Sequence, residues 1–211
     1  MRAGSRITVM GQNGAGKSTI FKLITGELKP QSGDIFITPP SASIGIARQV
    51  MPREALAFSI REYFATAFQE KKFNLDKLIA DVFDIVHLSL PLDRKLKGCS
   101  GGQQARLLLA HALIQNPDIL LLDEPTNNLD AYGIEHLTGF LMMYEKTCLV
   151  ISHDADFLNA FTDGVLYLDA HTQKVEQYTG NYTDVVEEIK DRIERENAQN
   201  ARMEAQIKEK R

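Results

Sequence analysis

The stretch Gly11-Gln-Asn-Gly-Ala-Gly-Lys-Ser-Thr19 decides the fold, because it has the spacing of a phosphate-binding loop. The apolar residues Ile7–Met10 before it are expected to form a buried strand, and Ile20–Ile24 after it to begin a helix. Its glycines let the backbone turn tightly, so that successive N–H groups can point at an anion. A glycine turn without a ligand is the alternative, but the strand and helix on either side favour a nucleotide site.

The side chains of this loop have expected roles in nucleotide binding. Lys17 is expected to reach the β- and γ-phosphates, and the Ser18 hydroxyl to bind Mg²⁺. We therefore predict ATP and Mg²⁺ as cofactors. The predicted nucleotide-contacting residues of the loop are Gly11, Gln12, Asn13, Gly14, Ala15, Gly16, Lys17, Ser18 and Thr19.

Composition limits the other possibilities. The chain has 211 residues with 44% hydrophobic residues, which suits one large domain or one domain with an appendage. Its net charge of −4 provides no general basic field, so any RNA contact must be local. The two cysteines, Cys99 and Cys148, indicate neither a disulfide framework nor a zinc site. No apolar run approaches the roughly 18 residues of a membrane span, and Met1–Arg6 lacks the apolar core of a signal peptide, so we expect a cytoplasmic protein.

Alternating strand and helix patterns predict an α/β fold with a mostly parallel sheet flanked by helices. Residues 59–116 resemble a small helical subdomain, in which Ser59 and Ser100 are expected to cap helices. The expected strands cover 7–10, 35–37, 44–47, 119–122 and 147–151, followed by a late β pair over 165–168 and 174–178. The expected helices begin at residue 20 and cover 60–68, 75–87, 101–116, about 131–145 and 156–161.

Polar side chains follow several of these strands. Asp123 and Glu124 end the apolar strand before them, where Asp123 can hold Mg²⁺ and Glu124 can polarise the attacking water. His153 follows a strand that we expect beside the Asp123 strand, so it can meet the γ-phosphate. Gln49 can join Mg²⁺ and the water. The alternative for Asp123 and Glu124 is a solvated acidic turn, which the preceding phosphate loop makes less favoured. For His153 and Gln49, spacing alone supports a structural role equally well.

The end of the chain has a different pattern. Residues 182–211 contain no Gly or Pro and many charges, which predicts a long helix. Its apolar residues form a seam that needs a partner, although a solvated helix without an RNA role is the alternative. The seam residues are Tyr182, Val186, Ile189, Ile193, Met203 and Ile207.

The order of motifs resembles an ATP-binding-cassette (ABC) domain, a P-loop NTPase fold, over nearly the whole chain. The motifs are Gly11–Ser18, Gln49, Ser100-Gly-Gly-Gln103, Asp123–Asp130 and Ser152-His153. The resemblance implies that Glu124 is the catalytic base, His153 the switch histidine and Asp130 a dimer contact. It also implies that a signature motif binds ATP held on an opposing cassette. The signature residues are Ser100, Gly101, Gly102 and Gln103.

Within that family, the chain resembles the ABC-F subfamily in Asp123–Asp130, in Ser152–Leu158 and in Tyr178–Tyr182 before the charged helix. The resemblance implies two cassettes in one polypeptide that act on the ribosome, with rRNA and tRNA as partners. Residues 1–181 would then be the N-terminal cassette, and 182–211 the start of the interdomain linker. One phosphate loop and one signature imply that a second cassette, from the same longer protein or a second copy, completes the site.

The sequence departs from the family pattern in three places. The strands that carry an adenine-stacking aromatic are missing before Arg2, Cys99 replaces the usual leucine, and Asn128 stands where histidine is common in ABC-F proteins. The leading hypothesis is a soluble ABC-F-type ATPase that acts on translating ribosomes. The ATPase subunit of a membrane transporter and a non-hydrolysing interaction module are the alternatives. The Asp123–Asp130 motif and the final helix favour the first over the transporter subunit.

Overall fold

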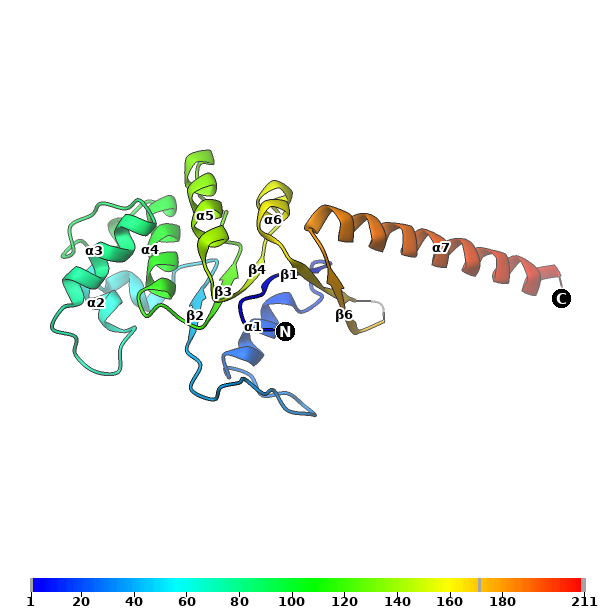
Figure 1. Ribbon diagram of the computed structural model, residues 1–211, viewed down its shortest axis with the longest axis horizontal. Coiled ribbons are helices and arrows are strands. Elements are labelled where there is room, and N and C mark those ends of the chain that lie inside the picture. Colours follow the sequence, from blue (N-terminus) through cyan, green and yellow to red (C-terminus); the bar gives the residue numbers. More distant parts are fainter. Residues whose placement is uncertain (1, 171, 210–211) are drawn as a thin grey trace.

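The computed structural model of the protein describes residues 2–170 and 172–209 (Figure 1). The strands are β1 (Arg6–Gly11), β2 (Ile44–Ala47), β3 (Ile119–Asp123), β4 (Thr147–Ile151), β5 (Gly164–Asp169) and β6 (Lys174–Thr179). The α-helices are α1 (Lys17–Ile24), α2 (Ile60–Ala65), α3 (Leu75–Ile85), α4 (Gly101–Leu113), α5 (Ala131–Met143), α6 (Ala155–Phe161) and α7 (Tyr182–Glu209). The last two residues of the helix predicted over 182–211 lie outside the described residues.

The six strands form one sheet in the order β2-β3-β4-β1-β5-β6. The first five strands in this order run parallel, and β6 pairs antiparallel with β5. The predicted mostly parallel sheet and the late β pair are both confirmed. The prediction that the His153 strand lies beside the Asp123 strand is also confirmed, because β3 and β4 are neighbours. The carboxyl ends of β1, β3 and β4 therefore meet at one edge of the sheet.

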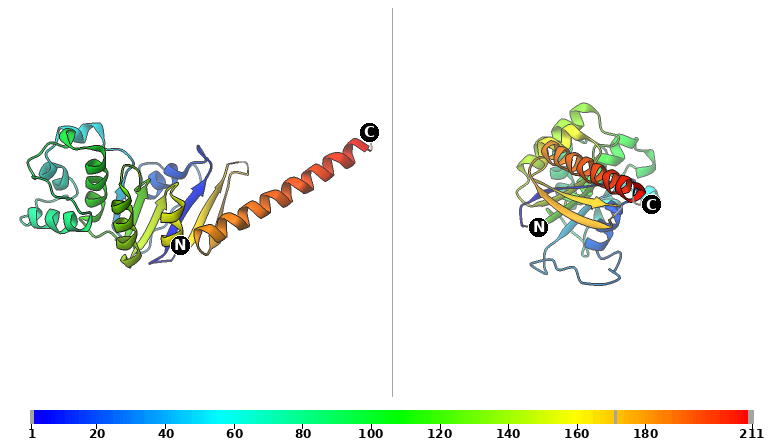
Figure 2. Two further views of the ribbon diagram at one scale, coloured as in Figure 1. Left: turned by 90° about the horizontal axis from the view of Figure 1, so that it is seen from above. Right: turned by 90° about the vertical axis from the view of Figure 1, so that its right-hand side faces the viewer.

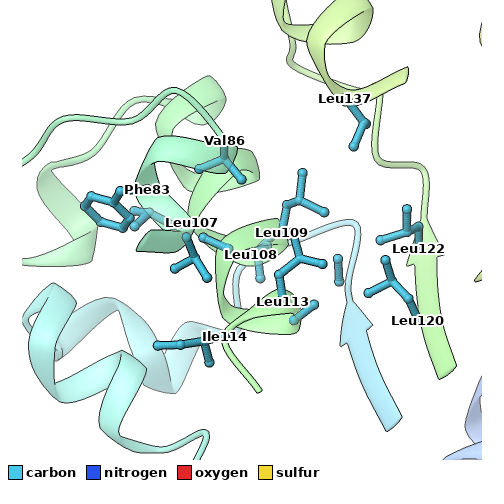
Figure 3. Packing of buried hydrophobic residues seen from close by; sticks show 14 of the residues in the cluster. Phe83, Val86, Leu107, Leu108, Leu109, Leu113, Ile114, Leu120, Leu122 and Leu137 are labelled. Carbon is cyan, nitrogen blue, oxygen red and sulfur yellow. The ribbon is translucent and has the colours of Figure 1, made fainter. Parts of the chain in front are cut away.

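Both faces of the sheet are buried at β3 and β4, which explains the continuous apolar run of β3. Leu120 and Leu122 belong to a core shared with α4, α5 and α6, whereas Leu121 packs with Phe21 of α1. Figure 3 shows Leu120 and Leu122 pointing toward α4, and Figure 2 shows α1 on the opposite side of the sheet from α5 and α6. Each leucine side chain buried in this way contributes about 1.5–3 kcal/mol of hydrophobic stabilisation. This packing holds the phosphate loop and the ends of β3 and β4 on one rigid support.

Helices α2 and α3 lie at one end of the molecule with α4 (Figure 1). The predicted caps form: the Ser59 hydroxyl accepts the N–H of Glu62, and the Ser100 hydroxyl accepts the N–H of Gln103. In both caps, the side chain of the residue three positions later accepts a hydrogen bond from the serine N–H. The helix predicted over 60–68 is shorter than expected, because its regular turns end at Ala65.

Gly45 permits α4 to pack closely on β2. A Cβ atom at Gly45 would lie 2.3 Å from the carbonyl oxygen of Ala112 and 2.7 Å from Cγ of Pro117. Both distances are shorter than any ordinary contact, so a larger residue would push the helix and strand apart. A glycine within a strand therefore marks the place where α4 meets the sheet.

The strand predicted over 35–37 is wrong, because these residues have no strand structure. Ile35 is 45% exposed and Phe36 is 87% exposed. A strand needs a neighbouring strand for its N–H and C=O groups, and no strand among residues 2–170 and 172–209 pairs with this segment. Its apolar residues thus have β propensity, but the segment pairs with none of the described strands.

Among the side chains that the structure describes, helix α7 contacts the sheet through its N-terminal part, up to Arg192, which pairs with Glu176 of β6. Val185 and Ile189 are buried against Val165 and Tyr167 of β5. Val186, which we predicted for the seam, is only half-buried, so the expectation missed Val185. Beyond this part α7 extends away from the body of the molecule (Figure 1). The side chain of Ile207, another predicted seam residue, lies outside the described part of the chain.

No described helix combines the length and the apolar character that crossing a membrane requires.

Candidate functional site

A pocket of about 440 Å³ opens at the carboxyl edge of β3 and β4, beside the loop after β1. This volume lies within the range of small-molecule sites. Its walls bring together residues that are far apart in the chain, including most of those predicted for nucleotide binding and catalysis. The lining residues are Asn13, Gly14, Gly16, Lys17, Ser18, Thr19, Gln49, Asp123, Glu124, Asn127, Ile151 and His153.

The phosphate loop joins β1 directly to α1. Gly16 precedes the first helical residue with φ 95°, a left-handed conformation that favours glycine, and no side chain caps the helix. The first N–H groups of α1 are therefore left for an anion. At Gly11, a Cβ atom would lie 2.7 Å from the carbonyl oxygen of Leu168, so this position also requires glycine. The local geometry is that of an anion-binding loop.

Lys17 extends over this loop. Its Nζ donates to the carbonyl oxygens of Gly11 at 2.8 Å and Gln12 at 3.2 Å. These two bonds hold the ammonium group at the pocket, where it can exchange them for bonds to phosphate oxygens. The Lys17 charge is thus positioned where a bound phosphate would be neutralised.

Asp123 and Ser18 lie together in the pocket. Burial raises the pKa of the Asp123 carboxyl above its usual value, while hydrogen bonding with Ser18 and the charge of Lys17 act in the opposite direction. Gln49 lines the same pocket. Carboxylate, hydroxyl and amide oxygens are ligands that Mg²⁺ prefers, so these three residues fit a magnesium site.

Glu124 and His153 form the second pair in the pocket. The Nε2 atom of His153 lies 3.3 Å from Oε1 of Glu124; the His153 side chain is 67% exposed, and that of Glu124 only 10%. Glu124 has φ 53°, and its N–H donates to the carbonyl of Ile151 at 2.8 Å. Burial raises the pKa of Glu124, with His153 partly opposing that rise. A raised pKa makes a carboxylate a better proton acceptor near neutral pH.

The signature residues lie elsewhere. Ser100, Gly101, Gly102 and Gln103 begin α4, and none of them lines the phosphate-loop pocket. Asp130 is also outside the pocket: its carboxylate caps α5 by accepting the N–H of Gly133 at 2.9 Å. The predicted site residues thus fall into two groups, one around the phosphate loop and one at the starts of α4 and α5.

The sequence-based expectations missed two residues that line the pocket and one that lies outside it. Asn127 lines the pocket from within the Asp123–Asp130 motif, so its position in that motif was the available signal. Ile151 lines it because β4 ends beside Glu124, which only the strand pairing reveals. Arg106 donates to Asp130, and nothing in the sequence indicated that pairing.

The chain matches known proteins over most of its length. The family model described as ABC transporter matches residues 1–127. Probable ATP-binding protein YheS of Escherichia coli K12 is 37% identical over 92% of this chain and 30% of the relative. ABC transporter F family member 5 of Arabidopsis thaliana is 29% identical over 94% and 34%. Energy-dependent translational throttle protein EttA of Mycobacterium tuberculosis H37Rv is 28% identical over 98% and 43%. This chain therefore corresponds to between 30% and 43% of the length of these relatives.

A solved structure has the same fold. The ATP-binding cassette MJ0796, described as dimeric and bound to ADP and Pi after hydrolysis, superimposes with a TM-score of 0.73 and 23% identity, over 85% of this chain and 87% of that one. The predicted ABC cassette fold is confirmed.

Proposed function

Because this chain belongs to the ABC transporter family, as an ATPase cassette related to ABC-F proteins, we propose that it hydrolyses ATP and acts on the ribosome. One observation carries the catalytic part of this proposal: the pair Glu124 and His153 lies in the same pocket as Lys17 of the phosphate loop. A general base and a phosphate-binding cation within one pocket are what hydrolysis of a phosphoanhydride requires.

Several pocket residues have a role in this reaction. The loop N–H groups and Lys17 bind the β- and γ-phosphates, and Ser18, Asp123 and Gln49 hold Mg²⁺, which neutralises phosphate charge when bound. Glu124 accepts a proton from the water whose oxygen attacks the γ-phosphorus, while the bond from that phosphorus to the leaving ADP oxygen breaks. His153 orients Glu124 and contacts the γ-phosphate from the neighbouring strand.

A second cassette completes the site in this proposal. The signature residues lie outside the phosphate-loop pocket, so they are free to face a nucleotide held elsewhere. The helix N-terminus after Ser100 favours an anion, as does the one after Gly16. The dimeric form of the MJ0796 cassette supports the same arrangement. The partner is either a second cassette of the same polypeptide or a second copy of this chain, which contacts Asp130 as well.

The ribosomal part of the proposal is supported by relatives and by α7. The name of EttA describes a translational throttle, and this chain aligns with 43% of that protein. Residues 1–181 are then the cassette, and α7 begins a linker that places charged turns beyond the domain against rRNA or tRNA, in the cytoplasm.

The alternative is the ATPase subunit of a membrane transporter, which the family description favours. Co-sedimentation of the protein with ribosomes would support the ribosomal function, whereas its recovery with membranes would support the transporter subunit.

Turnover of Mg²⁺-ATP tests the enzymatic proposal. The parent chain is compared with Glu124→Gln over a range of protein concentrations, and Glu187→Gln, an exposed change on α7, is the matched control. We expect turnover that rises faster than linearly with protein concentration, that Glu124→Gln lowers by roughly 10²–10⁴-fold and that the control retains. If no concentration gives turnover dependent on Glu124, this chain does not hydrolyse ATP alone, and the non-hydrolysing interaction module becomes the better account.

A further inference from the structure

The segment Glu124–Asp130 connects the phosphate-loop pocket to the signature helix. At one end, Glu124 and Asn127 line the pocket. Further along, the carbonyl oxygen of Asn128 lies 2.9 Å from where a Cβ atom of Gly102 would be, so the segment touches the signature backbone. At the other end, Asp130 caps α5. Any shift of this segment therefore moves residues of both groups of the site.

The segment contains strained backbone. Glu124 has φ 53° and Asn128 has φ 63°, both in the left-handed region that residues with a side chain rarely adopt. Such conformations each cost on the order of 1–3 kcal/mol and persist only where the surroundings hold them. Contacts with neighbouring elements must therefore hold the segment in place.

Arg106 of α4 provides one of these contacts. Its Nη2 donates to Oδ1 of Asp130 at 3.0 Å, and its Nη1 donates to the carbonyl oxygen of His87 at 3.1 Å. The same Oδ1 accepts the N–H of Gly133. The Arg106 side chain is 23% exposed and that of Asp130 is 69% exposed, so the guanidinium is the shielded member of the pair. One guanidinium thus joins the signature helix, the chain after α3 and the end of the Glu124–Asp130 segment.

We propose that Arg106 is a positioning residue, which holds the Glu124–Asp130 segment against α4 so that Glu124 and the signature keep a fixed relation. This inference rests on the proposed ATPase function. Arg106 does not line the phosphate-loop pocket, so it acts through Asp130 and not on the nucleotide. Its loss therefore affects the rate of hydrolysis more than the binding of ATP.

A second arginine pair offers a matched control. Arg61 of α2 donates twice to Asp76 of α3, at 2.8 and 2.9 Å, but its side chain is 50% exposed and that of Asp76 is 58% exposed. Neither residue lines the pocket or touches the Glu124–Asp130 segment. Exposed pairs of this kind contribute roughly 0–1 kcal/mol. Arg61→Ala therefore removes an arginine–aspartate pair without affecting the site.

Hydrogen exchange and steady-state kinetics together test the proposal on the full chain. In Arg106→Ala we expect the amides of Glu124 and of residues 126–130 to exchange about tenfold faster than in the parent, because the segment opens more often. We expect kcat to fall roughly 10–100-fold, as displaced catalytic groups do, while KM for ATP stays within about twofold. Arg106→Lys should restore only part of kcat, since one ammonium cannot donate in the fork geometry that joins His87 and Asp130.

Two results would overturn the proposal: unchanged exchange of the amides of Glu124 and of residues 126–130 in Arg106→Ala, or an equal loss of kcat in Arg61→Ala. A double-mutant cycle with Asp130→Asn adds a check, because additive effects on exchange would show that the two side chains are not coupled. If the parent chain has no turnover dependent on Glu124, hydrolysis by this chain alone is ruled out, and the exchange comparison still decides the role of Arg106.

Discussion

Oε1 of Glu124 lies 3.3 Å from Nε2 of His153, although each side chain follows a different strand. The contact exists because β3 and β4 are parallel neighbours, with Asp123 paired in register with Ile151. Glu124 is nearly enclosed while His153 is mostly exposed, so the histidine can move toward a ligand without unpacking the core. The Glu124 side chain is thus held by its surroundings, whereas the His153 side chain is free to change its position.

Glu124→Gln should make the fold more stable at neutral pH. Burial raises the pKa of Glu124 above its usual 4.5, so its carboxyl favours folding below pH 4.5 and loses that contribution as the pH rises through the folded pKa. The neutral amide avoids this loss. Thermal unfolding midpoints between pH 4 and 8 should show a variant that is more stable at pH 7.5, with a difference that narrows toward pH 4. A less stable variant at pH 7.5 would contradict the burial argument.

Ser100→Ala and Ser59→Ala should separate capping from ligand binding. Both serines accept an N–H bond at the start of a helix, at 3.3 and 3.2 Å, within the same type of capping box. Each substitution should lower the free energy of unfolding by about 1 kcal/mol in denaturant titrations. Only Ser100→Ala should also lower ATP turnover, by roughly tenfold or more, since it alone removes a proposed phosphate ligand. Equal turnover in the two variants would remove Ser100 from the proposed site.

Gly45→Ala should destabilise the chain, whereas Gly139→Ala should not. A Cβ atom at Gly45 meets the Ala112 carbonyl oxygen at 2.3 Å, but one at Gly139 in α5 has nothing within 4 Å. Overpacking at Gly45 is expected to cost about 1–3 kcal/mol, and alanine in the α5 interior to gain up to about 1 kcal/mol. Urea unfolding of the two variants measures both changes. A Gly45→Ala variant as stable as the parent would show that α4 can move away from β2.

Ser152→Ala should lower the free energy of unfolding more as a single substitution than in combination with Thr126→Val. The two hydroxyl oxygens lie 3.2 Å apart and are buried, and Ser152 Oγ also accepts the N–H of Asp154 at 3.1 Å. Removing Ser152 leaves a buried Thr126 hydroxyl without this bond, at a cost of about 1–3 kcal/mol. Replacing both residues should recover part of that loss in a denaturant double-mutant cycle. Additive losses would mean that the two hydroxyl groups contribute independently.

Local signals in the sequence predicted most of the elements. The strand before Gly11, the caps at Ser59 and Ser100 and the run over Ile119–Leu122 depend on short-range spacing, and the structure has all of them. The strand expected over Ile35–Ile37 failed for the opposite reason. Its residues have β propensity, but a strand forms only beside another strand, and that is a property of the whole sheet.

The sequence by itself determined the phosphate loop, the acidic end of β3 and the family, because these depend on residue types at fixed spacing. Tertiary structure alone decided which of those residues meet. The strand order places His153 beside Glu124 and leaves Ser100 outside the pocket, and α4 brings Arg106 to Asp130. Contacts between distant segments depend on how the buried faces of the sheet pack, which no short stretch of sequence encodes.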